Sequence, residues 1–210
     1  MPEPRELLVE TVGAAIELMA TASVAQHWDS PSVLPEMTVG AVAVHLVNAT
    51  CQTVNAYLDA EPPPGDRALA AHRLIAGVPA DLSADVHERV RSGSVDQAAM
   101  GAKDAAAWGA ESLAQLEQRL RRASPERRVR VMAGIDMQLD EFLVTRLVEA
   151  AIHLDDLASS VKLETPLSPA ATRVVVDCLV TVARHRHGDL EVMRAMSRPD
   201  RASAYVVRVF

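Results

Sequence analysis

The stretch that decides the fold is FLVTRLVEAAIHLDDL, residues 142–157, in which Arg146, Glu149, His153 and Asp156 follow one another at spacings of three, four and three residues. An α-helix advances about 100° per residue, so these four side chains form one stripe along a helix. A carboxylate and an imidazole therefore point in the same direction. Such a pair suggests a metal or catalytic site.

Hydrophobic residues border this stripe on both sides. Four leucines and an alanine lie on one side, and Val148 and Ile152 lie on the other. The solvent-exposed face of the helix is expected near Asp140 and Asp155. The first group comprises Leu143, Leu147, Ala150, Leu154 and Leu157. These walls predict a buried stripe, and a buried carboxylate or imidazole needs a partner or a metal ion to offset desolvation. A metal or catalytic site and an internal hydrogen-bond network both remain open at this point.

A metal site would need a third ligand, because catalytic zinc sites use three protein ligands and keep one position open. Among seven histidines, His45 stands out in the apolar run TVGAVAVHLVNATCQTV, residues 38–54, where an unpartnered imidazole would be costly. Taken alone, His45 is better interpreted as a core histidine with a hydrogen-bond partner. Together with Glu149 and His153 it predicts a three-ligand site inside a helix bundle. Asn48 and Gln52, nearby on the same helix, are candidates for lining a cofactor pocket.

The rest of the chain predicts an all-α protein, a four-helix bundle with extra short helices and a short C-terminal strand. Long helices are expected at 4–26, 38–58, 94–122, 137–160 and 168–186, short ones within 66–92, an extended segment at 127–137 and the strand at 204–210. Thr38, Ser168 and either Asp81 or Ser83 are expected to cap helices, and Gly188 to end the last long one. We expect one helical metal-binding domain at 1–190 and a short extension at 191–210.

Composition narrows the classes of function. The 210 residues are 49% hydrophobic but only 3% aromatic, which is typical of helices packed through small aliphatic side chains. A net charge of −7 argues against a nucleic-acid partner, and no apolar run approaches the roughly 20 residues of a membrane span. The start, MPEPRELLVE, lacks the pattern of a secretory signal, so we expect a cytoplasmic protein. Cys51 and Cys178 suggest neither a zinc finger nor a disulfide framework.

Two segments carry a family resemblance. SVLPEMTVGAVAVHLVNA, residues 32–49, and LVTRLVEAAIHLDDLA, residues 143–158, resemble the two signatures of the mycothiol-dependent, maleylpyruvate isomerase-like branch of the DinB/YfiT-like superfamily. The resemblance implies a DinB-like bundle in which His45, Glu149 and His153 bind a divalent metal, usually zinc. Met37 departs from the pattern, since family members commonly have a tryptophan there.

The resemblance also implies an activity: a divalent-metal-dependent transferase or isomerase that uses a low-molecular-weight thiol, mycothiol, as the nucleophile toward a small-molecule electrophile. Arg146 and Asp156 are then candidate catalytic residues: Arg146 either pairs with Glu149 or binds an acidic substrate, and Asp156 orients a ligand imidazole. A purely structural role is the alternative for both. Two alternatives stay open, namely a metal-dependent hydrolase that uses bound water and a non-catalytic metal-binding or regulatory bundle. Either a monomer or a homodimer is compatible with the sequence.

Overall fold

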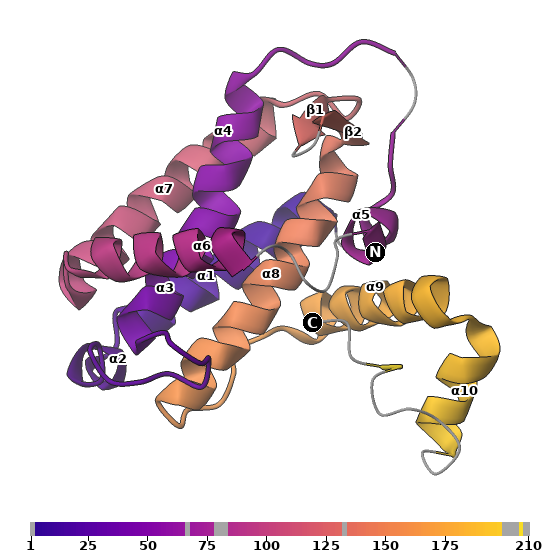
Figure 1. Cartoon of the computed structure of the whole chain (residues 1–210). Coiled ribbons are helices and arrows are strands. Elements are labelled where there is room, and N and C mark those ends of the chain that lie inside the picture. Colours follow the sequence, from indigo (N-terminus) through magenta and orange to yellow (C-terminus); the bar gives the residue numbers. More distant parts are fainter. Residues whose placement is uncertain (1–2, 66–67, 78–83, 132–133, 199–205, 208–210) are drawn as a thin grey trace.

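The computed structural model describes residues 3–65, 68–77, 84–131, 134–198 and 206–207. Helices dominate this part of the chain, and a β-hairpin interrupts them (Figure 1). The helices are α1 (Pro4–Met19), α2 (Ala22–Gln26), α3 (Val39–Val47), the π-helical turn η1 (Asn48–Gln52), α4 (Thr53–Asp59), α5 (Ala71–Gly77), α6 (Ala84–Ala98), α7 (Ala102–Arg122), α8 (Leu139–Ser160), α9 (Pro169–His187) and α10 (Asp189–Ser197). The strands are β1 (Arg128–Val131) and β2 (Ile135–Gln138).

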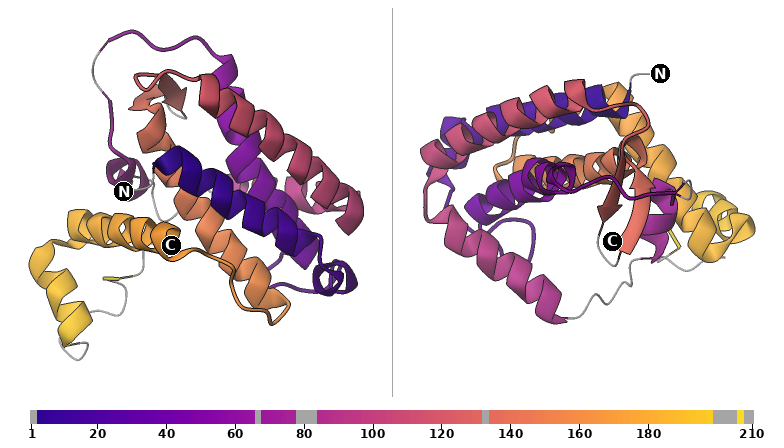
Figure 2. Two further views of the ribbon diagram at one scale, coloured as in Figure 1. Left: turned by 180° about the vertical axis from the view of Figure 1, so that it is seen from behind. Right: turned by 90° about the horizontal axis from the view of Figure 1, so that it is seen from above.

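Four long segments form the bundle. α1 contacts both α7 and α8, and the continuous rod of α3, η1 and α4 contacts the same two helices. Figure 2 shows α1 and α7 side by side along the bundle. The core between the four segments is fully buried at Leu8, Val12, Leu46, Leu116 and Leu154. The predicted all-α bundle is confirmed.

Local capping signals were predicted correctly. The Thr38 hydroxyl oxygen accepts the Ala41 N–H at 3.1 Å, and that of Ser168 accepts the Ala171 N–H at 3.3 Å. Gly188 ends α9 with a φ of 81°, a conformation that favours glycine. These interactions involve only neighbouring residues, which is why the sequence alone predicts them.

Two predicted helices are interrupted in the structure. The helix expected at 4–26 breaks after Met19, because Thr21 caps the separate helix α2 by accepting the Val24 N–H at 3.3 Å. The helix expected at 94–122 is divided between the end of α6, which runs to Ala98, and α7, which begins at Ala102, because Gly101 has a φ of 83° and separates the two. The caps expected for α6, at positions 81 or 83, lie outside the described residues.

The expected extended segment is a hairpin that leads directly into α8. β1 and β2 pair antiparallel, with Arg128 opposite Gln138 and Val131 opposite Ile135. α8 begins at Leu139, the next residue, so the hairpin fixes where the helix with the polar stripe starts.

Trp28, in the connector before α3, fixes the position of that helix. Its ring lies over Gly40, where an added Cβ would come within 2.5 Å of the indole, and its Nε1 donates a hydrogen bond to the Ala98 carbonyl at 2.8 Å. The indole therefore locks the start of α3 to the end of α6. Because His45 lies on α3, this contact also helps to position His45.

α9 covers one side of α8 and α5 and shares a second core with them that includes Val148, Ala151 and Val175. α10 was not predicted; it packs on α9 and projects beyond the bundle (Figure 1). The expected boundary at residue 190 falls within this helix.

The C-terminal strand expected at 204–210 lies outside the described residues apart from Val206 and Val207, which form a turn. Over the described segments, none of the helices combines the length and the apolar character that crossing a bilayer requires.

Candidate metal centre

His45 lies near the C-terminal end of α3 and faces α8. Its neighbours Val44 and Leu46 are fully buried, and the imidazole itself is half-buried. Burial, assisted by the charge of His153, lowers the pKa of His45 to about 4. At neutral pH the ring is therefore uncharged and one of its nitrogens has a free lone pair.

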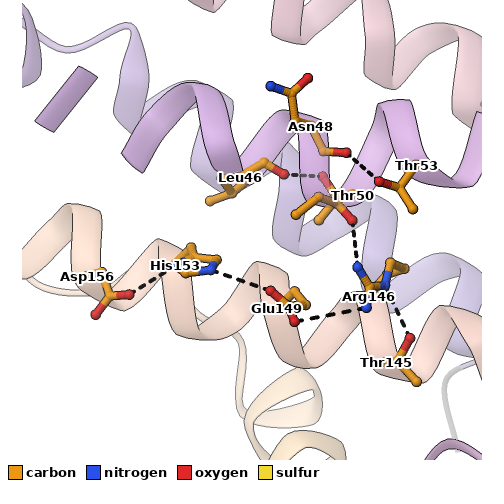
Figure 3. A network of polar contacts seen from close by, with 10 residues as sticks. Leu46, Asn48, Thr50, Thr53, Thr145, Arg146, Glu149, His153 and Asp156 are labelled. Carbon is orange, nitrogen blue, oxygen red and sulfur yellow. Dashed lines mark hydrogen bonds and ion pairs between the residues drawn. The ribbon is translucent and has the colours of Figure 1, made fainter. Parts of the chain in front are cut away.

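Glu149 and His153 lie four residues apart on α8, where both point toward the same side of the helix (Figure 3). Oε2 of Glu149 is 3.4 Å from Nε2 of His153. Burial by itself would raise the pKa of Glu149, but the hydrogen bond to His153 and the charge of Arg146 outweigh it and lower that pKa. Glu149 is therefore an ionised carboxylate, the form that binds metal.

Asp156 orients the imidazole of His153. Oδ2 of Asp156 is 3.1 Å from Nδ1 of His153, and because an ionised carboxylate only accepts hydrogen bonds, Nδ1 carries the proton. Burial would lower the pKa of His153, but its hydrogen bonds to Asp156 and Glu149 raise it to about 9. Nε2, the nitrogen on the Glu149 side, thus carries a proton that a metal ion would displace.

The structure brings the three predicted ligands together from helices far apart in the sequence. One ligand atom each from His45, Glu149 and His153 lie within 4.8 Å of one another. The two imidazole rings meet edge to face, with centroids 4.7 Å apart and planes at 84°. Two imidazole nitrogens and one carboxylate oxygen are the donor set of many catalytic zinc sites, so the residues present fit a divalent cation.

Arg146, the next member of the stripe, bridges α8 to η1 (Figure 3). Its Nη1 donates to the Ala49 carbonyl at 3.0 Å, its Nε to the Thr145 hydroxyl at 3.1 Å, and its carbon Cζ lies 5.2 Å from the centre of the Phe142 ring. Its Nη2 is 3.9 Å from Oε1 of Glu149, which is an ion pair without a hydrogen bond. Burial lowers the pKa of Arg146, and the negative charge of Glu149 opposes this shift.

Asn48 and Gln52, predicted to line a cofactor pocket, both lie in η1 and reach other helices. The Asn48 amide donates to Oε1 of Gln97 on α6 at 2.8 Å, and the Gln52 amide donates to the Ser112 hydroxyl on α7 at 2.8 Å. These bonds hold the π-helical turn beside the candidate site, and such turns are frequent at functional sites.

Sequence reasoning missed the residues that support the site through backbone groups. The Ala49 carbonyl accepts from Arg146, and the Ser160 hydroxyl accepts the N–H of Val33, which ties the connector before α3 to the end of α8. A carbonyl has no sequence signature. The sequence feature that could have indicated this region is the group of short polar residues Asn48, Thr50 and Thr53. Such side chains within a helix can form hydrogen bonds with backbone groups in place of the regular helical ones. The Thr50 hydroxyl indeed donates to the Leu46 carbonyl at 2.7 Å.

The remaining histidines do not join the site. His27, His185 and His187 are exposed, and His72 contacts only His185 among the described rings, with ring centres 6.2 Å apart. The His87 side chain lies outside the described residues. Within the described segments, His45, Glu149 and His153 are the group of three side chains whose His or carboxylate donor atoms lie close enough together to hold one metal ion.

Fold and site define a class: an all-α bundle that gathers two histidines and a glutamate from two helices. A family model described as the mycothiol maleylpyruvate isomerase N-terminal domain matches residues 9–158, and the chain belongs to this family. The resemblance stated from the two signatures is thereby confirmed, together with the DinB-like fold. The matched range contains all three candidate ligands, whereas α9 and α10 lie beyond it. Searches among curated proteins and among solved structures returned no match.

Proposed function

We propose that this chain is a divalent-metal-dependent enzyme that uses mycothiol, as an S-transferase or an isomerase, with His45, Glu149 and His153 as the metal ligands. The observation that carries the proposal is the convergence of these three donors within 4.8 Å, inside the range that the family model matches. Zinc is the metal we favour, because two imidazoles and one carboxylate suit it and leave a position for a further ligand.

When bound, zinc would lower the pKa of a coordinated thiol and so supply a thiolate nucleophile at neutral pH. The chain's own residues prepare the site for this role. Asp156 fixes the tautomer and the orientation of His153, and Glu149 provides the negative charge. Asn48 and Gln52 contribute by fixing η1 against α6 and α7. Thiol chemistry of this kind belongs in the reducing cytoplasm, which is where we propose the enzyme acts.

Arg146 is proposed to bind an acidic group on the electrophile. Among the described residues, its Nη2 makes no hydrogen bond, and its ion pair with Glu149 is 3.9 Å long. A half-buried guanidinium with unused donors is well suited to a substrate carboxylate, which it can bind through two parallel hydrogen bonds. This assignment predicts that charged electrophiles react faster than their neutral esters.

The test is a thiol-consumption screen on zinc-loaded protein. A panel of electrophiles, each as acid and ester, is offered with mycothiol, with glutathione and without thiol. We expect consumption of mycothiol with at least one acidic electrophile, and its loss in His153→Ala. His187→Ala is the matched control, because His187 is exposed at the end of α9 and should leave the rate unchanged.

Each contrary outcome points to a different function. Turnover that is equally fast without thiol would replace the proposal with a metal-dependent hydrolase. Stoichiometric zinc with no turnover of any electrophile would indicate a binding or regulatory bundle. Protein that binds no metal at all would overturn the ligand assignment itself.

A further inference from the structure

A second feature lies at the hairpin end of the bundle, away from the three ligands. The ends of α4 and α7, the segment after α4 and the start of β1 surround a hollow of about 650 Å³. Four arginines line it, Arg119, Arg122, Arg127 and Arg128, and the one carboxylate in its lining is Glu126. This is a local excess of positive charge in a chain whose net charge is −7.

Two of the four arginines are paired with carboxylates. Nη2 of Arg119 is 2.7 Å from Oδ1 of Asp59. Nη2 of Arg128 is 3.8 Å from Oδ2 of Asp136, whose two oxygens also accept hydrogen bonds from Arg130. The charge of these two arginines is therefore at least partly balanced within the protein.

The other two arginines have no such partner. Among the described residues, no carboxylate lies within 4.0 Å of the Arg122 or Arg127 guanidinium. Arg127 is half-buried; its Nη2 donates to the carbonyls of Leu58 and Ala60 at 3.2 and 2.6 Å, while its Nε is buried without a hydrogen-bond partner. Glu126 forms no ion pair with either arginine; its carboxylate accepts a hydrogen bond from the Ser124 hydroxyl at 2.5 Å.

A half-buried guanidinium with a buried, unpartnered N–H is costly unless an anion offsets it. Guanidinium groups bind oxyanions through parallel, charge-assisted hydrogen bonds. The lining of the hollow also includes the apolar residues Leu58, Pro62 and Pro63. A volume of about 650 Å³ is within the range of small-molecule sites, which are mostly apolar with a few charged groups.

We propose that this hollow binds a small organic anion, whose oxyanion group pairs with Arg127 and Arg122 and whose apolar part packs against Leu58 and the two prolines. The site is separate from the metal centre. Arg128 pairs with Gln138, the residue before α8 begins at Leu139. Glu149 lies ten residues further along α8, which is about 15 Å along the helix axis. Binding here therefore does not depend on the metal.

The direct test is a titration of metal-free protein at low ionic strength with inorganic phosphate and, in a second arm, with succinate. Calorimetry gives the affinity, and the NMR signals of the arginine Nε–H groups report the place. We expect saturable binding that shifts the Arg127 Nε–H signal and weakens as NaCl is added. Tighter binding of phosphate would identify a phosphate ester as the ligand class, and tighter binding of succinate a carboxylate.

Variants separate a site from general electrostatic attraction. Arg122 is exposed at the end of α7, so Arg122→Ala should fold normally and bind the preferred anion about tenfold more weakly. Arg127→Ala should weaken binding more, with thermal unfolding as the check on folding. Arg121→Ala is the matched control: it removes the same charge one residue away, but Arg121 pairs with Glu117 outside the hollow.

Two results would overturn the proposal. One is the absence of saturable binding by both anions, and the other is an equal loss of affinity in Arg121→Ala and Arg122→Ala. Because the experiment uses metal-free protein and no thiol, its outcome is independent of whether the metal centre is catalytic.

Discussion

α8 buries ionisable side chains, whereas α10 exposes apolar ones. On α8, the side chains of Glu149, His153 and Asp156 are only 30%, 16% and 18% exposed. On α10, Glu191 is 40% exposed and the apolar side chains Leu190, Met193 and Met196 are 54%, 56% and 68% exposed. α8 therefore places charged side chains inside the bundle, whereas α10 leaves apolar side chains exposed to solvent.

The difference shows what a buried charge requires. Each ionisable group of the α8 stripe has a neighbour in the stripe, so that removing one leaves another uncompensated in a low-dielectric interior. On α10, the ion pair between Glu191 and Arg194 is about two-fifths exposed on both sides, and water can replace either partner. Identical substitutions should therefore have unequal effects on the two helices.

The largest contrast is expected in metal content. Glu149→Ala should reduce bound zinc from about one equivalent to almost none, because two imidazoles alone do not make a stable site. Glu191→Ala on α10 should leave the zinc content unchanged. Elemental analysis of both proteins, with circular dichroism to confirm folding, measures the difference. A full equivalent of zinc in Glu149→Ala would contradict the ligand assignment.

Next in size is a contrast in the free energy of unfolding. Leu154 is fully buried in the bundle core, so Leu154→Ala should cost about 2–5 kcal/mol through lost burial and the cavity left behind. Leu190→Ala, at a position 54% exposed, should change stability by no more than about 0.5 kcal/mol. Urea unfolding of the metal-free proteins tests both. Comparable losses would show that α10 is covered in solution.

The sequence predicts those features of the fold that are determined by residues close together in the chain. The α8 stripe and its apolar walls follow from spacing within one helix, and the caps at Thr38 and Ser168 from adjacent residues. The break at Gly101 was missed because a single glycine costs a helix only about 1 kcal/mol, so tertiary packing decides. α6 packs on α3 and α7 on α1, and neither contact is visible in the local pattern.

The candidate site shows the same division. Glu149, His153 and Asp156 were predicted from one helix, whereas the pairing of His45 with them spans about a hundred residues. That pairing was predicted from the apolar surroundings of His45 and the need for a third ligand, and the family resemblance implied the same three residues. The partners of Asn48 and Gln52 on α6 and α7 could not be predicted, since they depend on the π-helical turn that rotates these amides. The Ala49 carbonyl that accepts from Arg146 is a backbone atom, which any residue would supply.

A smaller contrast exists within α8 itself, between neighbouring aspartates. Asp156→Asn should weaken zinc binding about 10- to 100-fold, because the amide no longer supplies the charge that orients and polarises His153. Asp155→Asn is the matched control: Asp155 is exposed on the same helix and accepts a hydrogen bond from Thr165 at 2.5 Å. Competition with a zinc chelator gives both affinities. Equal affinities would mean that Asp156 has only a structural role.

The smallest expected effect is on the pH dependence of the stability of the metal-free protein. Two histidines of the candidate site determine it, whereas α10 has no histidine. The folded pKa of His45 is about 4 against an unfolded value near 6.5, so the unfolded chain binds more protons between these values and stability rises with pH there. The folded pKa of His153 is about 9, so its contribution is complete below 6.5 and is lost as pH rises toward 9.

These two histidines together predict a melting temperature that is highest near pH 6.5 in metal-free protein and falls toward pH 9. Zinc should abolish that fall, because a ligated His153 stays neutral at Nε2 across the whole range. Thermal unfolding at pH 5–9 with and without zinc measures the effect, and metal-free His153→Gln should lack the decline above pH 6.5. A decline that persists in this variant would have to come from another group, and the hydrogen bonds of His153 to Asp156 and Glu149 would then not account for the pH response of the bundle.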